Sequence, residues 1–131
     1  YGQKQPRAQI TARIVQALAH PHVHAIAHPT GRLINRRDPY DVDMEAVLDA
    51  AQQYHKALEL NANPMRLDLN DVHCAAAKAR GVRIAICTDA HSVDGLDCLR
   101  YGLLQARRAG LTKGEVLNTR SWPQLRKLLH R

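Results

Sequence analysis

The chain has 131 residues, of which 45% are hydrophobic and 24% charged, a length and composition that indicate one folded domain and argue against disorder. It contains no apolar run near the roughly 20 residues that cross a bilayer, and its start lacks the apolar core of a signal peptide, so we expect a cytoplasmic protein with no membrane partner. The net charge of +7 favours a polyanionic partner, with a solvated basic surface as the equal alternative.

The first half of the chain alternates helical and strand-like patterns. Apolar residues at spacings of three and four predict a helix over 8–19, and a short apolar run predicts a strand over 23–28. After a polar, arginine-rich loop, a second helical stripe covers 43–55. A short apolar segment over 57–61 then predicts a buried strand.

The next helix lies between two residues that favour helix ends. Asn70 is a preferred cap for the helix start, and Gly81 is suited to the helix end. We expect this helix to turn four residues inward: Val72, Ala75, Ala76 and Ala79. The apolar run Val82–Cys87 follows directly and predicts a third strand.

The last part of the chain predicts a helix over 95–109, a weak strand over Val116–Asn118 and a final helix capped by Ser121. The helix over 95–109 is expected to bury four residues: Leu96, Leu99, Leu103 and Ala106. The final helix is expected to bury three: Leu125, Leu128 and Leu129.

Strands separated by helices of this length must pair in parallel, so the fold class is α/β. Parallel connections place the carboxyl end of every strand at one rim, where such folds hold their sites. Four strands are too few to close a barrel, which in its eight-fold form takes about 250 residues. The sheet is therefore open or the rest of a barrel is missing. Because the chain does not begin with Met, we expect a piece of a larger protein.

The segment Thr88-Asp89-Ala90-His91 follows the third predicted strand and places a carboxylate two residues before an imidazole. In extended backbone, residues i and i+2 project to the same side, so both groups can reach one target, most plausibly a metal ion. His28 stands in a similar position, at the end of the first strand and before Pro29. The alternatives are that Asp89 organises a turn and that backbone groups satisfy His28.

Three segments together resemble the C-terminal half of the PHP (polymerase and histidinol phosphatase) domain, as found in bacterial family X DNA polymerases. They run from His28 to Leu33, from Glu59 to Pro64 with Arg66 and Asp68, and from Thr88 to His91. The resemblance covers nearly all of residues 8–131. It implies that residues 1–131 form a partial PHP domain, the C-terminal half of a distorted seven-stranded β/α barrel built of parallel β/α units.

In that family the domain is associated with a cluster of two to three divalent metals, manganese or zinc, and with 3'-5' exonuclease activity on DNA. The resemblance implies metal-ligand roles for His28, Asp89 and His91, with Asp89 and His91 catalytic. It further implies that the polymerase core and the other ligand-bearing strands precede Tyr1. His22 and His24 form a His-x-His sequence on a strand that the family uses for another ligand, so we expect partly exposed strand histidines here, with a metal role for His24 as the alternative that strand geometry allows.

Several polar residues beside these positions complete the candidate site. Arg32, just beyond His28, is expected to contact a phosphate or DNA. Glu59, Asn61 and Asn63 either orient the metal ligands through hydrogen bonds or only shape a turn.

Metal-assisted hydrolysis of DNA phosphodiesters in the intact protein is therefore the predicted function. With only part of the ligand set, we expect the 131-residue chain alone to be nearly inactive, and its open sheet edge to make it oligomeric or domain-swapped. Two alternatives remain: a small-molecule phosphatase of the histidinol-phosphatase type and a non-catalytic structural PHP module.

Overall fold

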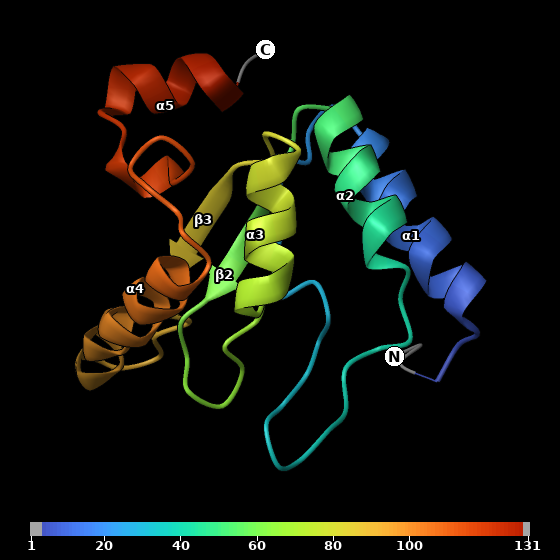
Figure 1. Cartoon of the computed structure of the whole chain (residues 1–131), viewed down its shortest axis with the longest axis horizontal. Coiled ribbons are helices and arrows are strands. Elements are labelled where there is room, and N and C mark those ends of the chain that lie inside the picture. Colours follow the sequence, from blue (N-terminus) through green and yellow to red (C-terminus); the bar gives the residue numbers. More distant parts are fainter. Residues whose placement is uncertain (1–3, 130–131) are drawn as a thin grey trace.

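Three short parallel strands form the centre of the computed structural model, which describes residues 4–129 (Figure 1). They are β1 (Ala25–Ile26), β2 (Ala57–Asn61) and β3 (Ile84–Cys87), hydrogen-bonded in the order β1-β2-β3. The predicted parallel α/β class is thereby confirmed. In the described residues this is an open sheet of three strands, so closure into a barrel stays a prediction.

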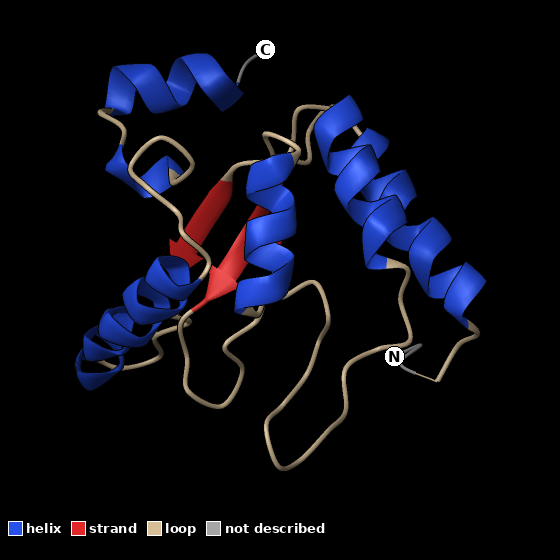
Figure 2. Ribbon diagram, viewed as in Figure 1, coloured by secondary structure: helices blue, strands red, loops and turns tan. Residues whose placement is uncertain are grey.

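Helices connect and cover the strands (Figure 2). They are α1 (Arg7–Ala19), α2 (Met44–Gln53), α3 (Asp71–Ala79), α4 (Leu99–Arg108) and α5 (Trp122–Leu129), with 3-10 helices η1 (Val93–Cys98) and η2 (Leu117–Thr119). Helices α1 and α2 pack together, and α3 contacts α4. The predicted caps are present at α3, where the Asn70 side chain accepts a hydrogen bond from the backbone N–H of His73 at 2.8 Å. None of the helices within residues 4–129 is long and apolar enough to span a membrane.

The core gathers around β2, in which every residue is buried. Leu58 and Leu60 are fully buried, as are Val47 and Leu48 of α2 and Ile84 of β3. Each such side chain contributes about 1.5–3 kcal/mol when it leaves water. The predicted buried strand over 57–61 is confirmed, although it includes the polar residues Glu59 and Asn61.

The buried faces of α3 and α4 differ from the prediction. Helix α3 buries Cys74 and Ala77, whereas Val72 is 68% exposed. The predicted helix over 95–109 divides into η1 and α4, and α4 buries Gly102 and Ala106. The predicted inward leucines Leu96, Leu99 and Leu103 are instead exposed. Small residues face the sheet because α4 lies so close to it that leucine would not fit there.

The predicted strand over 116–118 is also wrong. Only Val116 bridges Ile84, and the chain then enters η2. The Asn118 side chain takes the place of the next pair of backbone hydrogen bonds, because its Oδ1 accepts from the Ile86 N–H at 2.7 Å and its Nδ2 donates to the Ile86 carbonyl at 2.9 Å.

Two further predictions are corrected in part. The three leucines of α5 are only partly buried. Predicted strand 23–28 shortens to β1 because the backbone turns left-handed at His28.

We predict that Gly102→Ala destabilises the chain. A Cβ built at Gly102 would lie 2.7 Å from both Ala62 Cβ and Ile86 Cγ2, which real contacts essentially never show. Overpacking of this kind costs about 1–3 kcal/mol, which outweighs the roughly 1 kcal/mol that alanine gains in a helix. Urea unfolding would measure the change. Gly114→Ala is the control, because its added Cβ meets only Thr112 Oγ1 at an ordinary 3.4 Å; equal stability of the two variants would contradict the close packing of α4.

Candidate functional site

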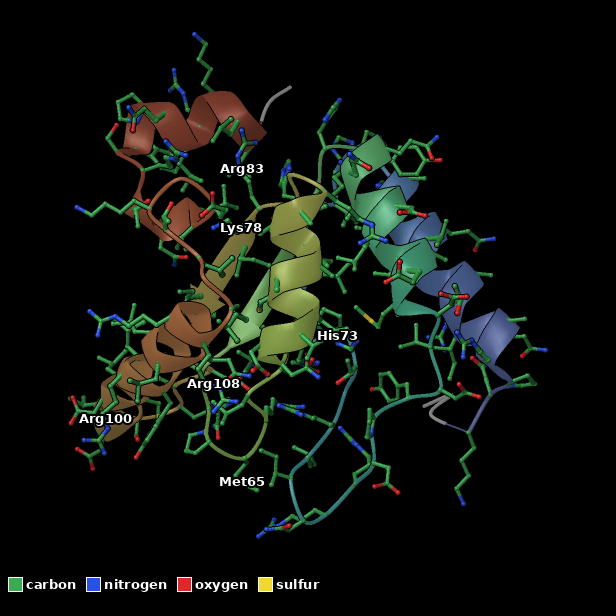
Figure 3. All side chains as sticks on the ribbon, in the orientation of Figure 1. Met65, His73, Lys78, Arg83, Arg100 and Arg108 are labelled. Atoms are coloured by element: carbon green, nitrogen blue, oxygen red, sulfur yellow. The ribbon has the colours of Figure 1, made fainter. Side chains whose placement is uncertain are left out.

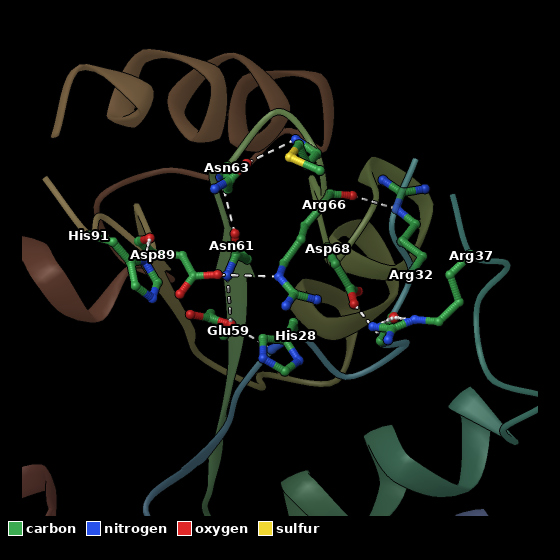
Figure 4. A network of polar contacts seen from close by, with 12 residues as sticks. His28, Arg32, Arg37, Glu59, Asn61, Asn63, Arg66, Asp68, Asp89 and His91 are labelled. Atoms are coloured by element: carbon green, nitrogen blue, oxygen red, sulfur yellow. Dashed lines mark hydrogen bonds and ion pairs between the residues drawn. The ribbon is translucent and has the colours of Figure 1, made fainter. Parts of the chain in front are cut away.

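Polar side chains gather at the carboxyl ends of the strands. Figure 4 shows His28, which follows β1, beside Glu59 and Asn61 of β2, with Asp89 and His91 after β3. The parallel register brings these segments to one rim, since Asn61 pairs with Cys87. Residues up to 63 positions apart in the sequence therefore share one face of the fold.

Glu59 holds the backbone at His28. This carboxylate is only 9% exposed, and its Oε2 accepts the His28 N–H at 2.5 Å and the Asn61 side-chain amide at 3.5 Å. Glu59 thus positions the chain at His28 through a contact with the backbone rather than the imidazole. A buried carboxylate that receives two donors is far less costly than an unpaired one.

Asn61 and Asn63 shape the turn that leaves β2. The Asn61 Oδ1 accepts the Asn63 N–H at 3.1 Å, and the Asn63 Oδ1 accepts the Met65 N–H at 2.9 Å. These bonds from a side chain to the backbone two residues on are Asx turns. Of the two roles left open from the sequence, the turn-shaping role is therefore present, and Asn61 also reaches Glu59.

Asp89 is held as a charged carboxylate. Arg66 Nε donates to its Oδ2 at 3.2 Å, and the pair is partly shielded, with 20% and 31% of the two side chains exposed. The Asn61 side-chain amide and then the Arg66 guanidinium lower the pKa of Asp89 below its ordinary value. His91 is exposed, and its Nδ1 lies 2.7 Å from the Asp89 carbonyl oxygen.

Two of the predicted ligands occupy left-handed backbone. The φ angle is 29° at His28 and 56° at Asp89. Asp adopts this conformation more readily than most residues, whereas His28 is held there by the Glu59 contact. Residues held in sparsely populated backbone regions cluster at functional sites, so this geometry supports a functional rim.

The side chains at the rim are of the types that bind metals, but too few of them lie together to form a complete metal site. Imidazole nitrogens and a carboxylate oxygen are ligands for manganese or zinc. Across residues 4–129, however, no three His, Cys, Asp or Glu side chains form a group that could hold a metal ion. His28, Asp89 and His91 share the rim without closing around one point, so these residues alone do not make a complete metal site.

Arg32 lies against the loop that follows β2. Its Nε donates to the Arg66 carbonyl at 2.7 Å, and its guanidinium also donates to the Leu67 carbonyl. The structure thus gives Arg32 a role in holding the loop that carries Arg66. Its contact with phosphate or DNA stays a prediction.

Two site residues received no role from the sequence. Arg66 pairs with Asp89, and Asp68 is fully buried, where its Oδ2 accepts the Thr30 N–H at 3.0 Å and the Gly31 N–H at 2.9 Å. Burial raises the pKa of Asp68. Both lie in the second segment that resembles the PHP family, and this resemblance was the signal from which a role could have been inferred. Their contacts could not be predicted, because their partners are distant in sequence.

The remaining histidines stay outside this rim. His24 is exposed ahead of β1, at the other end of the strand. His55 is exposed just beyond α2, and His73 on α3 is half-buried, where burial lowers its pKa (Figure 3). His130 lies outside the described residues.

Fold and rim together define a parallel β/α domain with a polar site at the carboxyl edge of its sheet. No protein-family model matches the chain. It is similar to the "DNA polymerase/3'-5' exonuclease PolX" of Bacillus subtilis (strain 168), with 43% identity over 127 residues, which is 97% of this chain and 22% of that protein.

Two further relatives are named as probable phosphatases. The protein of Thermoanaerobacter sp. (strain X514) is 32% identical over 115 residues, 83% of this chain and 44% of that protein. The protein of Caldicellulosiruptor bescii is 33% identical over 86 residues, 62% of this chain and 33% of that protein. The chain thus spans less than half the length of these relatives.

We predict that Asp89→Asn destabilises the metal-free chain by about 1 kcal/mol near neutral pH, because it removes the ion pair with Arg66. Asparagine tolerates the left-handed backbone at this position, so the change isolates the charge. Since the folded-state pKa of Asp89 lies below the ordinary 3.8, this contribution is complete above that value and is lost as the pH falls through the folded-state pKa.

Urea unfolding in the presence of a chelator, near neutral pH and again well below pH 3.8, would measure both parts of this prediction. Asp94→Asn is the matched control, because Asp94 is an exposed carboxylate on η1. A stability difference for Asp89→Asn that persists unchanged in acid would show that the ion pair is not its source.

Proposed function

We propose that this chain is part of a metal-dependent phosphoesterase that hydrolyses DNA phosphodiesters, as a 3'-5' exonuclease, within a longer protein of the family X DNA polymerase type. The observation that carries the proposal is the rim at which His28, Asp89 and His91 meet the Glu59–Asn61 strand end, in a chain 43% identical to a relative named as a polymerase and 3'-5' exonuclease. The net charge of +7 suits DNA as the partner.

Within this proposal, His28, Asp89 and His91 would hold part of a manganese or zinc cluster of two to three ions, with the other ligands supplied by segments ahead of Tyr1. Such ions activate water and stabilise the leaving oxygen of a phosphodiester. Glu59 fixes the backbone at His28, and Arg66 keeps Asp89 ionised and oriented. Arg32 holds the Arg66 loop, and we assign it a contact with a phosphate of the substrate.

The decisive experiment uses the complete protein that contains this chain. His91→Ala should lower the release of nucleotides from a 3'-labelled single strand by at least about a hundredfold, because loss of even an outer-shell partner costs about 10–100-fold. Nucleotide addition by the same protein should stay unchanged. His22→Ala is the matched control, an exposed histidine ahead of β1. Full nuclease activity in His91→Ala would refute the assignment.

A second candidate is a phosphatase that acts on a small monoester. The probable-phosphatase names of several relatives favour it, one of them aligned over 83% of this chain. The two functions separate in one assay, since a monoesterase would release phosphate from p-nitrophenyl phosphate much faster than nucleotides from DNA. His91→Ala should abolish whichever activity is present.

The isolated 131-residue chain should bind manganese weakly and hydrolyse little DNA, because the described residues hold no group of three metal-binding side chains. Isothermal titration that finds tight manganese binding would contradict the incomplete site.

We also propose that this isolated chain self-associates. The support is the exposed apolar surface of η1 and α4, where Val93 is 82% exposed and Leu96 59%. Light scattering that finds a monomer at high concentration would contradict the association.

A further inference from the structure

A pocket lies at the opposite end of the sheet from the candidate site. It is formed by the end of α2 and the start of β2, by the turn before β3 and by the last turn of α5. Its volume is about 270 Å³. The strands point away from it, so it is separated by the length of the sheet from the rim that carries His28 and Asp89 (Figure 1).

The charged side chains that line this pocket all carry positive charge. They are Lys56, Arg80 and Arg83, with His24 and His55 also in the lining, and none of the lining residues is Asp or Glu. Glu45 and Asp49 pair with Arg80. Lys56 donates only to the carbonyls of His20 and Pro21, at 3.2 and 3.5 Å, contacts that leave its charge uncompensated. Among the described residues, no ion pair involves Arg83, which sits below α5 in Figure 3.

The lining also contains aliphatic side chains: Leu117, Leu128 and Leu129, with Ala57 and Val82. A pocket lined by both cationic and aliphatic side chains suits a ligand that carries a phosphate beside a less polar ring. Lys and Arg side chains bind phosphates through charge-assisted hydrogen bonds.

We propose that this pocket binds a phosphate group of a single nucleic-acid strand, with Lys56 and Arg83 as the principal contacts and the α5 leucines against the neighbouring base or sugar. This site would hold the strand away from the reacting end. The identity of the ligand rests on the proposed function, whereas the binding itself requires neither metal nor the rim residues.

The test is fluorescence anisotropy of a labelled single-stranded oligonucleotide with the full chain, in the presence of EDTA. Lys56→Gln/Arg83→Gln should raise Kd at least tenfold. Its slope of log affinity against log salt should be shallower by about 0.7, because the pocket holds one phosphate and each phosphate contact to a single strand contributes about 0.7. Circular dichroism melting would verify that the variant is folded.

The matched control is Lys4→Gln/Arg13→Gln, which removes the same charge from exposed positions on α1 and just ahead of it. An equal loss of affinity and slope in both double variants would overturn the proposal, because net charge would then explain the binding. AMP is tested in the same assay as a competing ligand. If AMP binds the chain as tightly as the oligonucleotide, the proposal that the pocket binds a nucleic-acid strand is overturned.

Chelation keeps this result separate from the proposed hydrolysis. If Lys56→Gln/Arg83→Gln loses oligonucleotide binding while the complete unmodified protein hydrolyses no DNA, the binding pocket is supported and the nuclease function is refuted. If the double variant binds normally while the complete protein hydrolyses DNA, the nuclease function is supported and the binding pocket is refuted.

Discussion

The parallel pairing of β2 with β3 is the constraint on which the rest of the structure depends. Its register sets Leu58 opposite Ile84 and Asn61 opposite Cys87. Because of that alignment, Glu59 and Asn61 reach the same rim as Asp89 and His91, which follow β3. A shift by one residue would turn Leu58 and Leu60 to the opposite face of the sheet and separate the polar groups.

Buried carboxylates tie the first strand's end to this pair. Glu59 accepts the His28 N–H, and Asp68 accepts the N–H groups of Thr30 and Gly31. A β1 of two residues has few sheet hydrogen bonds of its own, so these side chains fix where the chain turns after it. Because backbone N–H groups and Arg32 compensate the carboxylates, their burial is tolerated, and the turn at His28 is held in a conformation it would otherwise seldom adopt.

The two ends of the sheet differ in chemistry because the strands all run one way. Acidic and amide groups meet at the carboxyl end, paired with Arg66, while the amino end gathers Lys56 and Arg83 beside the leucines of α5. A candidate reacting centre and a candidate phosphate pocket thus occupy separate ends. Part of the excess of positive charge read from the composition lies in this pocket, in Lys56 and Arg83.

The sequence by itself determined the order of the main helices and the first three strands, the parallel α/β class and the strand ends that carry His28, Asp89 and His91, since these follow from local periodicity and from the rule for parallel connections. Tertiary structure alone decided which face of α3 and α4 is buried, that Asn118 replaces a strand rung, and that Arg66 and Asp68 belong to the site. Close helix packing and contacts between residues some 20 to 40 positions apart leave no periodic trace in the sequence, which is why local patterns could not reveal them.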